Sequence, residues 1–233
     1  MSDSASVATA DDQHGHNERA RDKQTLLAQA AVCAGPLVGV GDVAICLKAY
    51  YRHVALDDLS AAGPDRLAAV TARHALLAVH RPQGRALVEV RRGGDAVLDP
   101  PADVIDIVTD DMPFLVDSLT MELAKHGLAA RLVVHPQLRV RRDVTGTLRE
   151  IAGAASAGQL KDDGASHDEL AESWTHIEIP PLADGEAEEL AADLTRVLGD
   201  VRVAVEDYAR MRARALSLAD ALTAESYGEA GGG

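Results

Sequence analysis

The pattern of hydrophobic and polar residues is most regular in the central part of the chain, between residues 103 and 142. A run of β-branched residues at 104–108 predicts a short buried strand. Apolar residues then recur at helical spacing, which predicts an amphipathic helix over 112–126 with Asp111 as its cap. Alternation of apolar and charged residues over 131–141 predicts a long half-buried strand after the helix.

A second pattern of strand, helix and strand follows towards the C-terminus. Residues 173–179 alternate like a strand, and residues 184–198 combine an acidic first turn with an apolar stripe, which is typical of a helix. The valines at 201–205 predict a last strand. The order over 103–207 is therefore β-α-β-β-α-β. This order predicts an α+β, ferredoxin-like sandwich, in which two helices cover one face of a four-stranded antiparallel sheet.

Under this fold the other face of the sheet is left bare. Alternation places charged side chains on that face, and the residues after 207 form a final helix with an apolar seam at three- and four-residue steps. A bare charged face beside an apolar seam predicts association with another domain or with a second copy of the chain. The predicted interface residues are Arg139, Arg141, His176, Glu178, Arg202, Tyr208, Met211, Leu218 and Leu222.

Composition divides the rest of the chain into segments. Residues 1–20 are small and polar without periodicity, which predicts a disordered tail. A stretch rich in Gly, Ala, Ser and Asp at 143–168 predicts a flexible loop at a hairpin tip. The predicted division is a tail at 1–20, a helical lead-in with one or two strands at 21–100, the βαββαβ domain at 101–207, a helix at 208–226 that links to a following domain, and a flexible end at 227–233.

Charge and residue usage narrow the class of partner. The formal net charge is −14 and aromatic residues make up 3% of the chain, which disfavours a phosphate- or base-binding surface, so we expect no nucleic-acid partner. No apolar run approaches the roughly 18 residues needed to span a bilayer, and no signal-peptide pattern opens the chain. We therefore expect a cytoplasmic protein with no membrane partner, whose two cysteines, Cys33 and Cys46, are reduced.

Two short motifs invite a ligand-binding interpretation. His14 and His16 lie in the predicted tail with no third ligand nearby in sequence, so we expect no metal site there. The segment GPLVGVG at 35–41 has GxxxGxG spacing and follows a helix, whereas a dinucleotide-binding turn has GxGxxG spacing and follows a strand. We therefore expect a flexible connector at 35–41, no cofactor bound by this chain and no catalytic residue in it.

Three segments resemble the N-terminal part of the very large NAD-specific glutamate dehydrogenases of bacteria. They are TDDMPFLVDSLTMEL at 109–123, HGLAARLVVHPQLRVRRD at 126–143 and VEDYARMRARAL at 205–216. A fourth segment, AYYRHVALDDL at 49–59, is similar to a short helical region that precedes them in the same family. The resemblance covers roughly residues 41–224.

The resemblance implies an ACT-like regulatory domain with the β-α-β-β-α-β order. Such domains commonly pair between chains and bind small amino acids at the interface, so it also implies a homo-oligomer with an amino-acid effector. In this family the oxidative deamination of L-glutamate to 2-oxoglutarate and ammonia uses NAD, which is held in a distant C-terminal catalytic domain. The resemblance places that domain outside this chain.

The turn from the first sheet strand into its helix is the candidate ligand site. It holds Asp110, Asp111, Asp117 and Ser118 near a helix N-terminus, where backbone N–H groups could hold an α-carboxylate and the aspartates an α-amino group. In the alternative, Asp111 only caps the helix and Asp110 only ends the strand. ACT domains that bind amino acids usually carry a glycine in this turn, and Pro113 stands here instead, which removes a backbone donor.

Two functions from different classes follow from these features. The first is a non-catalytic regulatory and assembly module of an NAD-dependent glutamate dehydrogenase. The alternative is a free-standing ACT-like domain that senses an amino acid or docks to a protein and has no link to catalysis.

Overall fold

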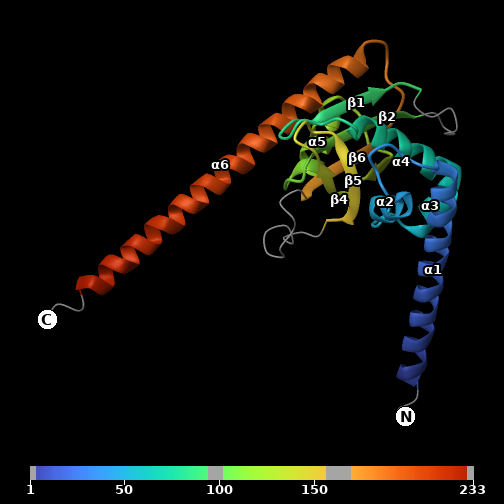
Figure 1. Ribbon diagram of the computed structural model, residues 1–233, viewed down its shortest axis with the longest axis horizontal. Helices are drawn as coiled ribbons and strands as arrows, with labels where there is room; N and C mark the ends of the chain where they lie inside the picture. The colour runs from blue at the N-terminus through green and yellow to red at the C-terminus, as the bar shows by residue number, and fades with distance from the viewer. Residues whose placement is uncertain (1–3, 94–101, 156–168, 230–233) are drawn as a thin grey trace.

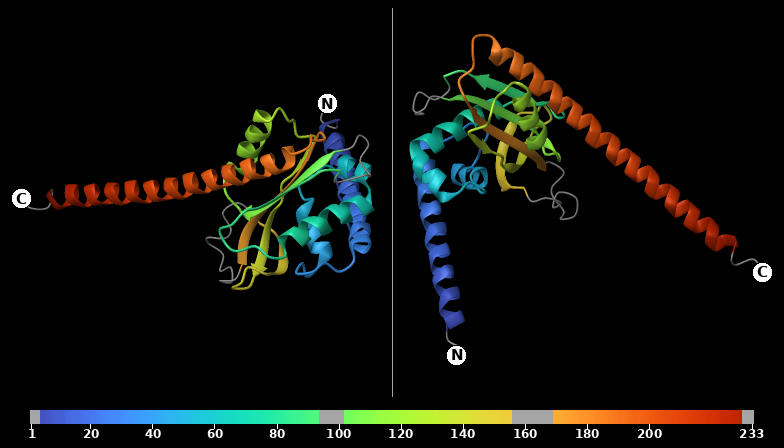
Figure 2. Two further views of the ribbon diagram at one scale, coloured as in Figure 1. Left: turned by 90° about the horizontal axis from the view of Figure 1, so that it is seen from above. Right: turned by 180° about the vertical axis from the view of Figure 1, so that it is seen from behind.

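A computed structural model describes residues 4–93, 102–155 and 169–229. Its body is an antiparallel sheet with helices packed on both faces, and one long helix projects from each end of the chain (Figure 1, Figure 2). The predicted α+β class with an antiparallel sheet is therefore confirmed. The described helices are α1 (Ser4–Ala34), α2 (Val43–Tyr50), α3 (Leu56–Ala62), α4 (Pro64–Ala78), α5 (Leu115–Lys125) and α6 (Glu186–Glu229).

The described strands all belong to one six-stranded sheet. They are β1 (Leu87–Arg91), β2 (Asp103–Asp110), β3 (Leu132–Val134), β4 (Gln137–Arg142), β5 (Leu148–Ala154) and β6 (Glu169–Ile179). The order is β1-β2-β6-β4-β5, and β3 pairs with β6 beyond the end of β4. The two longest strands, β2 and β6, therefore form the centre of the sheet.

The strand predicted over 131–141 is present as two pieces, β3 and β4. Pro136 lies between them, and a proline cannot donate a hydrogen bond to the ladder. Both pieces keep a single register along β6, so Val134 and Leu138 point to the same face of the sheet. The interruption is therefore local and leaves the predicted alternation intact.

One face of the sheet is covered by α5 and the first part of α6. Isoleucines that alternate along β2 and β6 point to this face. They pack against the apolar stripes of both helices, which also contact each other. The two predicted helices therefore share one side of the sheet. The buried residues of this layer include Ile105, Ile107, Ile177, Ile179, Leu115, Leu119, Leu123, Leu190, Leu194 and Leu198.

The opposite face of the sheet is covered as well, so the prediction of a bare face is wrong. Helices α2 and α4 pack there on the strands, in one apolar cluster with side chains such as Val108 and Trp174, and α1 packs on α2 and α4. Alternation along β6 places His176 and Glu178 on the same face as Trp174, as predicted, but both are buried beneath the helical layer. The covering layer comes from the segment that the sequence presented only as a lead-in.

The predicted last strand at 201–205 is also wrong, because α6 runs without a break through these residues. Val201 and Val205 pack on the α5 side of the sheet as part of a helical stripe. Gly199 lies inside the helix and does not end it. Strand β1, from the lead-in, occupies the outer edge of β2. The described residues therefore form six strands, and among them the predicted four-stranded β-α-β-β-α-β order is not confirmed.

Three segments expected to lack regular structure differ from that expectation. Residues 4–20 belong to α1 rather than to a disordered tail, because a helix can form from alanines and polar side chains without an apolar stripe. In the predicted loop at 143–168, strand β5 pairs with β4, and residues 156–168 lie outside the described part. The connector at 35–41 packs against β5, where the buried Val40 accepts a hydrogen bond from Ile151 N–H at 3.0 Å.

Candidate functional site

The turn after β2 differs from the helix cap that the sequence predicts. Helix α5 begins at Leu115, and the residue before it, Phe114, has φ of 68° and makes no side-chain cap. A left-handed backbone disfavours a non-glycine residue by roughly 1–2 kcal/mol. Asp111 caps no helix, and its carboxylate instead accepts a hydrogen bond from the side-chain amide of Gln137 at 3.2 Å.

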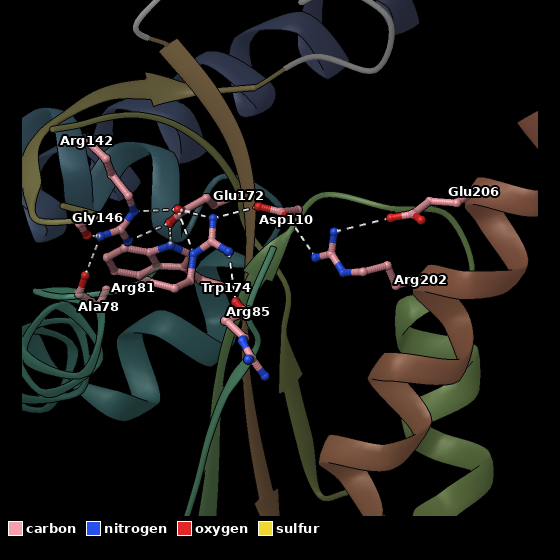
Figure 3. A network of polar contacts seen from close by, with 10 residues as sticks. All are labelled: Ala78, Arg81, Arg85, Asp110, Arg142, Gly146, Glu172, Trp174, Arg202 and Glu206. Carbon is pink, nitrogen blue, oxygen red and sulfur yellow. Dashed lines mark hydrogen bonds and ion pairs between the residues drawn. The ribbon is translucent and has the colours of Figure 1, made fainter. Parts of the chain in front are cut away.

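Asp110, at the end of β2, connects the two helical layers. Arg81, which follows α4, donates a hydrogen bond to one carboxylate oxygen at 2.7 Å, and Arg202 of α6 donates to the other at 2.5 Å (Figure 3). Burial alone would raise the pKa of Asp110, but the two guanidinium groups outweigh it and lower the pKa. Asp110 is therefore an ionised carboxylate that is engaged on both oxygens.

Glu172 of β6 lies between two buried arginines beside the indole of Trp174 (Figure 3). Arg142 donates to its carboxylate at 2.6 and 2.9 Å, Arg81 at 2.6 and 2.9 Å, and the indole N–H at 3.0 Å. Burial alone would raise the pKa of Glu172, and the arginines lower it instead. The exposed fractions of the side chains of Arg81, Glu172 and Arg142 are 0%, 0% and 2%. This network is a buried, charge-assisted connection between the lead-in layer and the sheet.

The remaining N–H groups of Arg81 and Arg142 donate hydrogen bonds to backbone carbonyls. Arg81 donates to the carbonyl of Arg85 at 2.9 Å, and Arg142 donates to those of Ala78 and Gly146 at 2.8 and 2.9 Å (Figure 3). A cavity of about 270 Å³ lies beside both arginines. Because each guanidinium already has partners within the protein, neither is free to hold an anionic ligand in the cavity.

Asp117 and Ser118 lie within the first turn of α5. Asp117 is exposed, and its carboxylate suits the positive end of the helix dipole. The N–H of Ser118 donates to the carbonyl of Phe114 at 3.0 Å, so this amide is used within the helix. Of the four predicted ligand residues, Asp110 and Asp111 thus have side-chain partners, and only Asp117 projects into solvent.

A second buried polar cluster lies between α4 and the sheet, with Asp106 of β2 at its centre. Its carboxylate bonds to Nδ1 of His176 at 2.6 Å and pairs with Arg91 of β1. His74 of α4 lies 3.8 Å from the same carboxylate, and its Nδ1 is 2.7 Å from the hydroxyl of Tyr50. Side chains from β1, β6 and α4 therefore meet at one buried carboxylate of β2.

Glu178 extends this cluster towards α4. Arg66 donates to its carboxylate at 2.5 Å, and Nε2 of His176 lies 3.6 Å away, which is an ion-pair distance but too long for a hydrogen bond. Burial alone would raise the pKa of Glu178, but His176 and Arg66 lower it. The prediction that His176 and Glu178 form part of an open docking face is therefore wrong, because both contribute to the contact between α4 and the sheet.

The two histidines of the cluster have pKa values shifted in opposite directions. Burial lowers the pKa of His74 to about 4. Burial also lowers the pKa of His176, but the hydrogen bond to Asp106 and the nearby carboxylates outweigh it and raise the pKa. For Asp106, burial is outweighed by His74, His176 and Arg91, which lower its pKa to about 2. At neutral pH Asp106 is ionised and His74 is neutral.

We expect the stabilising contribution of His176 to decline with rising pH. A histidine whose pKa is raised on folding contributes fully below its ordinary pKa of about 6.5 and loses that contribution as the pH rises through the raised value. Urea unfolding of the wild type and of His176→Gln, from about pH 5.5 to about pH 9, measures this contribution. The difference in unfolding free energy should shrink as the pH rises, and a difference that grows would contradict the assignment.

The other predicted interface residues occupy separate places. Arg139 and Arg141 project to the side of the sheet opposite Leu138 and Val140, with ion pairs to Glu169, so they share no face with His176. Arg202 pairs with Asp110. The seam residues Tyr208, Met211 and Leu218 have exposed fractions of 65%, 64% and 59%, and the side chain of Leu222 lies outside the described part.

Arg81, Arg142 and Glu172 form the centre of the observed network, and sequence reasoning missed all three. The one local signal was alternation along the predicted strand 131–141, which places Arg142 on the same face as Val140. Arg81 and Glu172 are 91 residues apart, and nothing in the sequence links them. Within the described residues no helix is both long and apolar enough to cross a membrane.

Comparison with known proteins gives one consistent result. The chain is 36% identical over 115 residues to the NAD-specific glutamate dehydrogenase of Pseudomonas aeruginosa, which covers 49% of this chain and 7% of that protein. It is 34% identical over 121 residues to the enzyme of the same name from Halomonas elongata, and that alignment covers 52% of this chain and 7% of the Halomonas enzyme. It is 29% identical over 161 residues to the NAD-specific glutamate dehydrogenase of Mycobacterium tuberculosis, and that alignment covers 69% of this chain and 9% of the Mycobacterium enzyme. This chain therefore spans less than a tenth of the length of these relatives.

The sequence profile of one domain family matches the part of the chain that forms the sheet. It matches residues 46–194, which include most of α2, all of α3, α4 and α5, the described strands, and the first residues of α6 that pack on the sheet. The match and the three relatives agree with the resemblance found in the sequence. The chain belongs to the family described as "Glutamate dehydrogenase, ACT1 domain".

Proposed function

We propose that this chain is a non-catalytic regulatory and assembly module of an NAD-dependent glutamate dehydrogenase. The parent enzyme would oxidatively deaminate L-glutamate to 2-oxoglutarate and ammonia, with NAD held by a catalytic domain elsewhere in the longer protein. The names of the relatives and the small share of their length that the chain covers support this assignment.

The observation that carries the docking role is the exposed second half of α6. The apolar stripe of this helix packs on the sheet as far as Val201 and Val205 and then continues in the same helical steps through Tyr208, Met211 and Leu218. Figure 1 shows this half of α6 extending away from the body of the protein. An isolated helix gains little stability without packing of its apolar face, so we infer that a second copy or another domain of the same enzyme covers it.

The polar chemistry of the described part supports a structural rather than a catalytic role. Asp106, Asp110 and Glu172 are each engaged by side chains of the same chain, and these contacts hold the helical layers on the sheet. A catalytic acid or base must reach a substrate, and a carboxylate closed in by arginines does not. These contacts give the three carboxylates a structural role, which supports the proposal.

Self-association through the seam is tested by sedimentation velocity of the purified chain. We expect the wild type to sediment as a species heavier than one chain and Leu218→Asp to sediment as a single chain, because a buried unpaired carboxylate opposes apolar pairing. Ala213→Asp introduces the same charge on the opposite side of α6 and should leave the wild-type mass unchanged. An identical mass for the wild type and Leu218→Asp would contradict pairing through the seam.

The turn at 110–118 stays a proposed site for an amino-acid effector. Since Asp110 and Asp111 are engaged, Asp117 is the predicted residue best placed to meet an α-amino group. Calorimetric titration with glutamate, aspartate and arginine should give saturable heat that Asp117→Asn abolishes. Absence of heat with all three amino acids would remove the effector from the proposal and leave the docking role.

A further inference from the structure

A mixed cluster of metal-ligand side chains lies where α5 meets α6, apart from both buried networks. Glu122 and His126 are four residues apart on and just after α5, so they lie on one side of that helix, and Asp193 faces them from α6. One ligand atom from each residue lies within 4.8 Å of the other two. Nε2 of His126 and the carboxylate of Asp193 are 3.1 Å apart.

We propose that this contact is a binding site for a divalent transition metal ion of the zinc type. An imidazole nitrogen with two carboxylates is a donor set that Zn²⁺ accepts, at bond lengths of about 2.0–2.2 Å, with water in a remaining position. Ligands of one ion then lie up to about 4 Å from each other, so small side-chain rotations would bring the three atoms into range. The histidine separates this site from a purely acidic cluster, which would favour Ca²⁺ or Mg²⁺.

The cations around the cluster determine how the metal would bind. Lys125 bonds to Glu122 at 2.5 Å, and Arg196 reaches Glu122 at 3.3 Å and Asp193 at 3.1 Å. The side chains of Lys125 and Arg196 are 63% and 53% exposed, whereas that of Glu122 is 4% exposed. The negative charge of the buried Glu122 carboxylate is thus balanced by Lys125 and Arg196, two long side chains that can turn out into solvent. A bound metal ion would take over this compensation, and the two cations compete with it.

The site would crosslink α5 to α6. Both helices pack on the same face of the sheet, and α6 then leaves the body of the protein (Figure 2). A metal ion held by both helices would fix the base of the projecting half of α6 more firmly than the ion pairs do.

Calorimetric titration of the chelator-treated chain with Zn²⁺ tests the site, with Co²⁺ as a spectroscopic probe of the coordinated nitrogen. We expect one ion per chain at this contact and a rise in unfolding temperature, because a ligand that binds only the folded state stabilises it. His126→Ala and Asp193→Ala should each weaken binding at least about tenfold. His53→Ala, an exposed histidine outside the cluster, and the pair His14→Ala and His16→Ala should leave this binding unchanged.

The Lys125→Ala variant distinguishes a metal-binding site from a cluster that is held only by ion pairs. Removal of a competing cation should tighten Zn²⁺ binding if the three side chains hold the metal, since like charges repel at this distance. Circular dichroism checks that each variant is folded. Lack of saturable binding by the folded wild type, or binding that His126→Ala and Asp193→Ala leave unchanged, would overturn the proposal.

Discussion

Replacement of Glu172 by alanine is expected to lower the free energy of unfolding by about 3–5 kcal/mol. The substitution leaves the guanidinium groups of Arg81 and Arg142 buried without the carboxylate that both of them share. It also removes the acceptor for the indole N–H of Trp174. A buried charge that loses its partner keeps its desolvation penalty, so the loss should exceed that of an ordinary hydrogen bond.

Urea unfolding followed by circular dichroism measures this loss. Glu206→Ala is the matched control, because Glu206 lies at the exposed end of the same line of ion pairs, 4.0 Å from Arg202 and 57% exposed (Figure 3). This control should change the free energy of unfolding by no more than about 0.5 kcal/mol. A loss below about 1 kcal/mol for Glu172→Ala would show that the two arginines find other partners and that the network is not a structural centre.

Trp174→Ala is also expected to have a large effect and to lower the free energy of unfolding by about 3–5 kcal/mol. Trp174 is fully buried on the sheet face that the lead-in helices cover. Its ring packs against that of His74 of α4, with centroids 5.1 Å apart. The substitution therefore opens a cavity at the contact between α4 and the sheet. Because this contact holds a whole layer, we expect the lead-in helices and the sheet to unfold in one transition.

Phe114→Ala is the control for an aromatic truncation. Phe114 is 68% exposed and contributes to neither core, so the change in unfolding free energy should stay within about 0.5 kcal/mol. If Trp174→Ala lowered the free energy of unfolding as little as Phe114→Ala does, the stability of the lead-in layer would not depend on its contact with this face of the sheet. The account of two covered faces would then fail.

The central segment could be predicted because its signals are local. β-branched residues at 104–108 and the apolar stripe of Val116, Leu119 and Leu123 fix a strand and a helix without any distant contact. The start of that helix was predicted less well, because it begins at Leu115, directly after the left-handed Phe114, and Asp111 does not cap it.

The last strand was predicted wrongly because its valines satisfy two periods. Residues 201, 203 and 205 alternate as in a strand, but Val201 and Val205 are also four residues apart and continue the helical stripe from Leu194 and Leu198. Contact with the α5 layer favours the helix. The outer edge of β2 is available to β1, so the sheet needs no strand from that segment.

The buried networks could not be predicted, because their members come from distant parts of the chain. Alternation placed His176 and Glu178 correctly on one face of β6, but whether that face was open depended on α4, which lies about 100 residues earlier in the sequence. Arg66 and Glu178 are 112 residues apart. Charged residues that alternate along a strand therefore indicate that they share one face of the sheet. Whether that face is exposed to solvent or forms ion pairs with a covering layer depends on residues elsewhere in the sequence.

We expect the apolar seam of α6, proposed above as a docking surface, to be covered in the full-length enzyme. The most direct test is the rate at which a thiol reagent modifies Leu218→Cys, with Cys33→Ser removing the exposed native thiol and Cys46 buried. The rate is compared between this chain, dilute enough to be a monomer, and the full-length dehydrogenase. The account predicts fast modification in the chain and strong protection in the full-length enzyme, and equally fast modification in both would contradict it.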